Sequence, residues 1–218
     1  PNADFIDVSV ATHCLAVRST GVVVAWGVNG AGQCNVPAPN TGFVAVSAAD
    51  GHSLGLRQDG SLVAWGDNSN GQCVIPTPNA DFRAAVTGGS FCLGLKRDGS
   101  LVAWGDNRYG QCNLPQPNAG FVSVATAWNR CLGVRSDGSV VAWGYPVSAM
   151  LPEGDYVAAA PGPANILGLR RDGTAVVVGS NGYLQRNVPA PNEGFTAVAG
   201  NYDCGFALRS NGSIVVWG

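Results

Sequence analysis

The sequence predicts an all-β fold built from one repeated antiparallel unit, and three observations lead to this prediction. Glycine accounts for 31 of the 218 residues, about twice its usual share of roughly 7%. Residues with a strong helix preference are scarce, because charged residues make up only 12% of the chain and there is one methionine. A Trp-Gly pair recurs with a spacing of 39 residues, at Trp26, Trp65, Trp104 and Trp143.

This period divides the chain into six copies, which we expect to form a single domain. Val178-Gly179 replaces Trp-Gly in the fifth copy, and the pair returns at Trp217-Gly218, where the sixth copy stops before its last segment. Either the last repeat is short or a seventh repeat is missing from this sequence. The copies span about residues 1–39, 40–78, 79–117, 118–152, 153–191 and 192–218.

Each copy is expected to contain four antiparallel strands, as the second copy illustrates. The first strand begins at Phe43, and the second, 53–57, alternates with its leucines on one face. Asp59-Gly60 predicts a two-residue turn with positive φ, so the third strand, 62–65, pairs with the second as a hairpin. The last segment, 72–76, ends in proline and is expected to be an edge strand.

A four-stranded unit that is covered on both faces needs similar neighbours. This predicts a β-propeller of four-stranded antiparallel blades, either a six-bladed ring or part of a seven-bladed one. A small residue in the second strand of every copy favours a propeller over a linear stack, because blades crowd where they converge on an axis. That position holds Ala16, Gly55, Gly94, Gly133, Gly168 and Ala207.

Four short segments recur along the whole chain, and in the second copy they are Gly51–Leu56, Asp59-Gly60, Val63–Gly66 and Asp67-Asn68 with Gly71-Gln72. They resemble the repeats of the regulator-of-chromosome-condensation family. The resemblance implies a propeller, usually of seven blades, that serves as a rigid docking disc. It also implies protein partners, since members include an exchange factor for a small GTPase and a secreted bacterial inhibitor of β-lactamase.

Charge and hydropathy limit the classes of partner that we expect. The net charge is −2, from 12 basic and 14 acidic residues, so we expect no nucleic acid partner. No apolar run approaches the roughly 18 residues of a membrane helix, so we expect no membrane insertion. The sequence leaves the compartment unknown, and the likeness to the secreted inhibitor favours an extracellular bacterial protein. We expect a monomeric domain.

The seven cysteines are an odd number, so at least one is unpaired within the chain. Cys34, Cys73 and Cys112 share one place in the repeat, and Leu151 takes that place later. A site shared by cysteine and leucine is typical of a small buried apolar residue. We therefore expect these three cysteines to pack in the core, with a disulfide framework as the alternative.

No catalytic, metal or cofactor site is expected. The segment Gly51–Gly55 matches the G-x-S-x-G motif of hydrolases, but a strand and a hairpin follow Ser53 where that motif needs a helix. His13 and His52 occupy equivalent places without further ligands nearby in sequence, so each is expected to bond a neighbouring loop. The segment that begins at Asp67 lacks the glutamate of a calcium loop and is expected to be a turn.

One basic residue occupies the same position in every copy. We expect these side chains either to pair with the nearby turn aspartates or to remain solvated, and a rim that attracts anionic partners is the alternative. The column consists of Arg18, Arg57, Lys96, Arg135, Arg170 and Arg209.

The expected binding surface is formed by loops that differ between copies. Trp128 lies outside the Trp-Gly period, in the loop between the first two strands. A rigid repeat with one variable loop per copy is typical of a binding scaffold, and Trp, Tyr and Arg are frequent interface anchors. The predicted contact residues are Phe91, Trp128, Asn129, Arg130, Tyr202 and Asp203, with Tyr109 and Tyr145 in the segment after Trp-Gly.

These observations predict a non-enzymatic scaffold that binds another protein through one face of a propeller. Three alternatives stay open: a secreted inhibitor of a hydrolase such as β-lactamase, a guanine nucleotide exchange factor, and a lectin. Inhibition, nucleotide-release and glycan-binding assays separate them. An enzyme in the channel of the propeller is disfavoured, because titratable groups do not cluster in the sequence.

Overall fold

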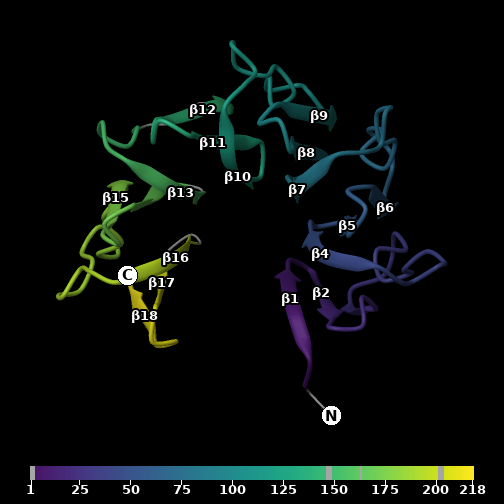
Figure 1. Cartoon of the computed structure of the whole chain (residues 1–218), viewed down its shortest axis with the longest axis horizontal. Coiled ribbons are helices and arrows are strands. Elements are labelled where there is room, and N and C mark those ends of the chain that lie inside the picture. Colours follow the sequence, from purple (N-terminus) through teal and green to yellow (C-terminus); the bar gives the residue numbers. More distant parts are fainter. Residues whose placement is uncertain (1–2, 146–148, 163, 201–203) are drawn as a thin grey trace. The chain divides into compact units, whose positions relative to one another are not determined.

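The computed structural model describes residues 3–145, 149–162, 164–200 and 204–218. In this part of the chain, eighteen strands form six antiparallel sheets of three strands each (Figure 1). Residues up to 119 form one compact unit, and residues from 120 onward form a second. The described residues contain no helix long and apolar enough to cross a membrane.

The first unit contains three sheets, and in each of them the strands follow one another in chain order. The sheets are β1 (Phe5–Val10), β2 (His13–Arg18) and β3 (Val23–Gly27); β4 (Phe43–Ala48), β5 (His52–Arg57) and β6 (Leu62–Gly66); and β7 (Phe82–Thr87), β8 (Phe91–Lys96) and β9 (Leu101–Gly105).

The second unit repeats this arrangement, with the middle strand again bonded to both of its neighbours. Its sheets are β10 (Phe121–Ala127), β11 (Arg130–Arg135) and β12 (Val140–Gly144); β13 (Tyr156–Pro161), β14 (Asn165–Arg170) and β15 (Ala175–Gly179); and β16 (Phe195–Gly200), β17 (Gly205–Arg209) and β18 (Ile214–Trp217).

The prediction of four strands per repeat is wrong, because the segment expected as the fourth strand has its N–H groups committed to a turn. The Cys73 N–H donates to Asn68 Oδ1 (2.9 Å), and the Val74 N–H donates to Gly71 O (3.0 Å). A strand needs those donors for its neighbour. Residues 72–76 therefore form no ladder with β6.

An asparagine side chain replaces the missing strand. The Leu62 N–H at the start of β6 donates to Asn79 Oδ1 (2.8 Å), and Asn79 Nδ2 donates to Leu62 O (2.9 Å). We call this pair of hydrogen bonds the amide clamp. It satisfies an outward-facing backbone donor and acceptor that would otherwise be left to solvent. It recurs at Val23–Asn40, Leu101–Asn118 and Ala175–Asn192.

The hairpin between the second and third strands is confirmed, but its turn has three residues rather than two. The Arg57 N–H donates to Ser61 O (2.9 Å), which leaves residues 58–60 in the turn. Only Gly60 among them has a positive φ, of 82°. This pattern is the usual three-residue hairpin, in which a glycine follows a tighter turn.

The small residue in each middle strand makes room for an aromatic ring of the same sheet. A Cβ on Gly55 would lie 2.5 Å from the Phe43 ring, and one on Gly94 would lie 2.4 Å from the Phe82 ring. The requirement we had assigned to crowding at an axis is therefore met within a single sheet. Gly133 and Gly168 stand in the same relation to Phe121 and Tyr156.

Neighbouring sheets of the first unit are joined through tryptophan and through their first strands. Trp65 Nε1 donates to Gln33 O (2.8 Å), and Trp104 Nε1 donates to Gln72 O (2.9 Å), so each indole reaches the preceding repeat. The Val46 N–H donates to Asp7 Oδ2 (2.8 Å). These bonds, with the buried indoles, explain why the repeats need one another.

None of the seven cysteines, all of which the structure describes, forms a disulfide. Cys34, Cys73 and Cys112 are half-buried, and each Sγ donates to a backbone carbonyl six residues earlier, at 3.2 Å for Cys73 and 3.3 Å for the other two. Burial raises the pKa of Cys73 and of Cys112 to about 11. These thiols stay protonated at neutral pH and act as small hydrogen-bonding groups.

Candidate functional site

Each sheet has two ends of different character. At one end, which we call the loop end, the link between the first two strands meets the segment after Trp-Gly. The Tyr145 N–H donates to Asn129 O (2.8 Å), and the Asp67 N–H donates to Gly51 O in the same way (2.8 Å). The other end carries the Asp-Gly turns, and we call it the turn end.

Trp128 stands at the tip of a two-residue hairpin at the loop end of the fourth repeat. The pairing of Ala127 with Arg130 leaves only Trp128 and Asn129 between β10 and β11. Trp128 has a φ of 54° and a side chain that is 60% exposed. A bulky residue at positive φ is strained by about 1–3 kcal/mol, and such strain is found mainly at functional sites.

Arg130 is buried beneath this hairpin and does not form part of its exposed surface. Its side chain is buried, and Nη1 donates to Gly162 O (2.8 Å) at the loop end of the fifth repeat. Burial lowers the pKa of this guanidinium, and the nearby Tyr145 partly offsets that effect. The prediction of Arg130 as a contact residue is therefore wrong, and it acts as an anchor between two loops.

The other predicted contact residues divide by exposure. Tyr109 and Tyr145 are about half exposed at the loop end, and Asn129 is partly buried. Phe91 begins β8 and is fully buried, so its predicted surface role is wrong. Phe91 therefore belongs to the strand and not to the loop that precedes it. Tyr202 and Asp203 lie outside the described residues.

A second exposed pair was only partly visible in the sequence. Tyr183, noted as a variable position, is exposed, and so is Leu184, which has a φ of 66°. Leu184 takes the place that glycine holds at positive φ in the first three repeats (Gly32, Gly71 and Gly110). Alignment of the repeats would have identified this leucine as an anomaly.

Non-glycine residues with positive φ are few in the described part of the chain. Two are aspartates, Asp4 and Asp81, a residue type that tolerates this conformation. The other two, Trp128 and Leu184, are bulky, apolar and exposed, and both lie in loops of the second unit. The loop end of this unit therefore holds apolar side chains in strained positions open to solvent.

The serine motif does not form a nucleophile. Ser53 Oγ lies 2.7 Å from His13 Nε2, but it donates its proton to Gln33 O (2.8 Å), and both side chains are fully buried. A serine nucleophile must give its proton to the base and must face the substrate. Here the imidazole donates to the serine instead, so His13 links two sheets through a strand residue.

The histidines have no metal-binding partners among the described residues, where no group of three His, Cys, Asp or Glu side chains converges. His52 Nε2 lies 3.4 Å from Cys92 Sγ of the next sheet, and the imidazole is buried. Burial lowers the pKa of His52 to about 4, against which Asp67 acts weakly. The imidazole is therefore neutral at physiological pH.

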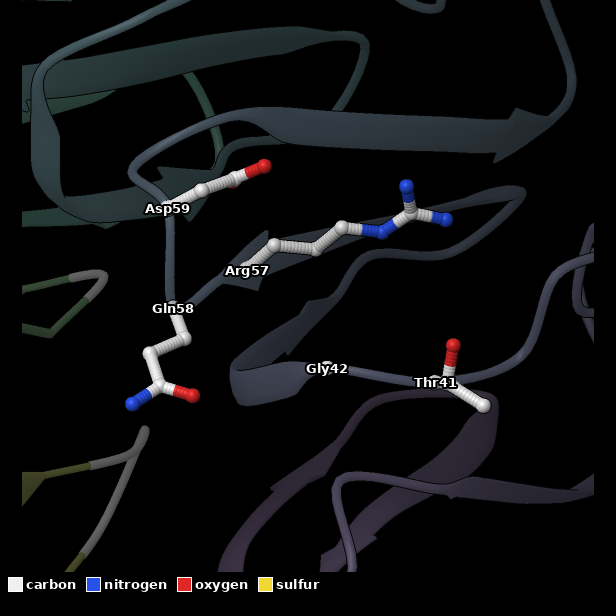
Figure 2. Close-up of a pocket in the computed structure, with 5 residues that line it drawn as sticks. All are labelled: Thr41, Gly42, Arg57, Gln58 and Asp59. Carbon is white, nitrogen blue, oxygen red and sulfur yellow. The ribbon is translucent and has the colours of Figure 1, made fainter.

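The basic column at the turn end caps aromatic rings. The Arg57 guanidinium carbon lies 5.1 Å from the centre of the Phe43 ring, and Nη2 donates to Pro39 O (3.0 Å). Figure 2 shows the Arg57 guanidinium apart from the Asp59 carboxylate in the cavity of about 430 Å³ that both line. The same cation–π contact occurs at Arg18, Lys96, Arg135, Arg170 and Arg209.

Arg57 therefore neither pairs with the turn aspartate nor extends freely into solvent. Asp59 accepts hydrogen bonds from the Ser61 N–H (2.9 Å) and Ser61 Oγ (2.7 Å), which lower the pKa of its carboxyl group. The aspartates at 98, 137 and 172 accept the same two bonds from the Ser or Thr that follows the glycine. The acidic residues of these turns therefore stabilise the hairpins in which they lie.

Comparison with protein families identifies the repeat. Residues 43–72 and 82–111 match the model of the regulator of chromosome condensation (RCC1) repeat. The second and third repeats are RCC1 repeats. The matched segments run from the first strand through the buried glutamine, and so include the glycine–aromatic contact and the Trp-Gly pair. No curated protein matches the sequence.

Solved structures show the same fold over nearly the whole chain. Human WBSCR16 has a TM-score of 0.78 at 19% identity and covers 100% of this chain and 77% of its own. Prp20p of Saccharomyces cerevisiae has 0.79 at 18%, covering 100% and 72%. The ectodomain of the Physcomitrella patens receptor kinase CR4 has 0.75 at 22%, covering 95% and 59%. The fold is a β-propeller fold, which confirms that part of the prediction.

Proposed function

We propose that this chain is a non-enzymatic scaffold that binds another protein through the loop end of its second unit. The observation that carries the proposal is Trp128, which is 60% exposed although its backbone is held at positive φ. Folding alone gains little from a strained and solvated indole. A binding partner that buries this ring would explain why the strain is retained.

The surroundings of Trp128 suit a preformed contact. The hairpin is fixed by the Arg130 bond to Gly162 O and by the bond from the Tyr145 N–H to Asn129 O. A contact residue that is already ordered loses little conformational entropy on binding. Tyr145, which is half exposed and hydrogen-bonded to the residue that follows Trp128, extends the aromatic surface.

The likeness to known propellers supports a protein partner. Prp20p has been described with its binding to Gsp1p and histones, and Kap60 has been seen bound to yeast RCC1 (Prp20). The buried Ser53–His13 pair, whose serine proton is held by a backbone carbonyl, supports a function without catalysis. Inhibition of a hydrolase and nucleotide exchange are finer forms of this function, whereas glycan binding is an alternative with another class of partner.

The decisive variant is Trp128→Asn, because asparagine accepts positive φ and preserves the hairpin while removing the indole. Wild-type protein and variant are compared on a purified β-lactamase, a small GTPase loaded with fluorescent GDP, and a glycan array. We expect a protein target, with affinity reduced by about tenfold or more in the variant. Trp26→Ala is the matched control, since Trp26 is also half exposed but lies in the first unit.

Thermal unfolding of the Trp128→Asn variant separates binding from folding. Its melting temperature should equal or exceed that of the wild type, because strain is removed and no buried contact is lost. A protein target bound equally well by the variant would contradict the proposed surface. Binding to glycans alone, or to none of the protein targets, would contradict the proposed class of partner.

A further inference from the structure

The turn end of the fourth repeat contains a cavity beside a strand that lacks the amide clamp. The cavity has a volume of about 340 Å³ and is lined by Val140, Leu151, Pro152, Glu153, Gly154 and Tyr156, among others. Val140 is the first residue of β12. It lies in the second unit, on sheets of that unit alone, and at the opposite end of the fourth repeat from Trp128.

Val140 is equivalent to the residues that the amide clamp binds in four other repeats. It pairs with Val134 in the register in which Leu62 pairs with Leu56. The Arg135 N–H donates to Ser139 O (2.9 Å), as Arg57 does to Ser61. The N–H and C=O of Val140 therefore face away from β11, and no hydrogen bond from a described side chain reaches them.

The clamp is lost because glutamate takes the place of its asparagine in this repeat, which is also four residues shorter than its neighbours. In each clamped repeat a Pro-Asn pair ends three residues before the next aromatic residue, as in Pro78-Asn79 before Phe82. Before Tyr156 the same place holds Pro152-Glu153. A carboxylate has no proton to donate to Val140 O, so glutamate cannot form both bonds of the clamp. Glu153 is exposed.

A second residue at the cavity, Tyr156, also has an unsatisfied polar group. The Tyr156 hydroxyl is buried and has no hydrogen-bond partner among the described residues, whereas the equivalent residue in the other repeats is phenylalanine. An unpaired buried hydroxyl costs about 1–3 kcal/mol. Arg57 and Arg209 each donate a hydrogen bond to a proline carbonyl. The guanidinium of Arg170 makes no such bond to any described residue.

We propose that this cavity binds an asparagine side chain of a partner protein, presented in a Pro-Asn segment. The carboxamide oxygen accepts from the Val140 N–H, and the carboxamide nitrogen donates to Val140 O. The geometry is that of Asn79 on Leu62, with bonds of 2.8 and 2.9 Å. The site adds a second, separate contact to the proposed loop-end surface and does not depend on it.

The choice of occupant follows from the chain itself. Four clamps show that this backbone position pairs with a primary carboxamide, and all four carboxamides follow a proline. An aspartate in the ligand would face Val140 O without a donor and would lie near Glu153, so it should be rejected. The site therefore distinguishes asparagine from aspartate, which differ by one group.

The test uses a synthetic peptide with the sequence of residues 75–81, Ile-Pro-Thr-Pro-Asn-Ala-Asp, and a control peptide in which its asparagine is aspartate. Each is titrated into the full chain while backbone amide shifts are followed by NMR. The proposal predicts saturable shifts centred on the Val140 amide, with binding at least tenfold weaker for the control. Equal binding of both peptides, no binding at millimolar concentration, or shifts away from Val140 would overturn it.

The variant Glu153→Asn restores the Pro-Asn pair within the chain. It should occupy the site, reduce peptide binding at least tenfold and raise the melting temperature by about 2–4 °C. Unchanged peptide binding in this variant would also overturn the proposal. The Trp128→Asn variant should bind the peptide as the wild type does, so a failure of the loop-end surface and a failure of this site give different results.

Discussion

The second and third repeats, in the first unit, differ from the fourth and fifth, in the second unit, in what their loops do. In the former, polar side chains close their own turns: Asp67 accepts from Ser69 and Gln72, and Asp106 from Arg108. In the latter, Trp128 and Leu184 hold strained backbone positions and leave apolar groups in solvent. Residues that follow the repeat pattern serve the fold, and departures from the pattern mark the candidate sites.

At the turn end the second and third repeats differ from the fourth alone. The amide clamp at Leu62 and Leu101 seals two consecutive sheets, and its absence at Val140 leaves a cavity beside an unpaired tyrosine hydroxyl. A shortened repeat that had lost only its function in folding would be expected to refill this space with apolar side chains. Instead, the space is open, and polar residues such as Ser139 and Glu153 line it together with apolar ones.

The largest expected effect concerns the tryptophan slot of the regular repeats. Trp65→Ala should cost about 3–5 kcal/mol of unfolding free energy, because it removes a buried indole and its bond to Gln33 O. The same change at Trp26, whose side chain is 50% exposed, should cost less than about 1 kcal/mol. Urea denaturation of both variants checks the difference, and equal losses would show that the slot matters less than its sequence suggests.

A smaller effect is a difference between the two units in how their stability depends on pH, because both histidines lie in the first unit. The pKa of His52 falls from 6.5 in the unfolded chain to about 4 when folded. Above pH 6.5 both states are neutral. Between pH 6.5 and 4 only the unfolded chain takes up the proton. The free energy of unfolding therefore decreases by about 3 kcal/mol as the pH is lowered through this range, and below about pH 4 it decreases no further.

The variant His52→Asn isolates this contribution, because asparagine already occupies the equivalent buried position at Asn165. The variant should lose most of the stability slope between pH 6.5 and 4, whatever its stability at pH 7. Hydrogen exchange should place the acid sensitivity in residues up to 119. An unchanged slope, or equal sensitivity of the two units, would mean that the carboxylates rather than His52 set the response.

The sequence predicts the period, the three paired strands and the hairpins, because these depend on local alternation and on glycine in turns. It does not reveal the amide clamp, since Pro-Asn in a loop is an ordinary turn signal until the strand that it faces is known. The contact of Arg57 with Phe43 depends likewise on the register of β4 with β5, although both columns are visible in the repeat.

The candidate site was located less well than the fold for a related reason. Trp128 was found because it breaks the period, and Leu184 was missed although it breaks the period too, in a slot that otherwise holds glycine. Phe91 and Arg130 are buried because each begins the middle strand of its sheet. The equivalent residues of three other repeats, His13, His52 and Asn165, do the same. Burial at a strand end depends on neighbouring sheets, which one repeat alone does not describe.

The smallest expected effect tests the amide clamp itself. Asn79→Ala leaves the Leu62 N–H and C=O without their partner and should cost about 1–2 kcal/mol. Glu153→Ala, at the equivalent place in the shortened repeat, should change stability by less than about 0.5 kcal/mol, because no clamp exists there. Urea denaturation measures both variants. If the two changes cost the same, Glu153 closes the fourth repeat as Asn79 closes the second, and the contrast between the two regions would not extend to the turn end.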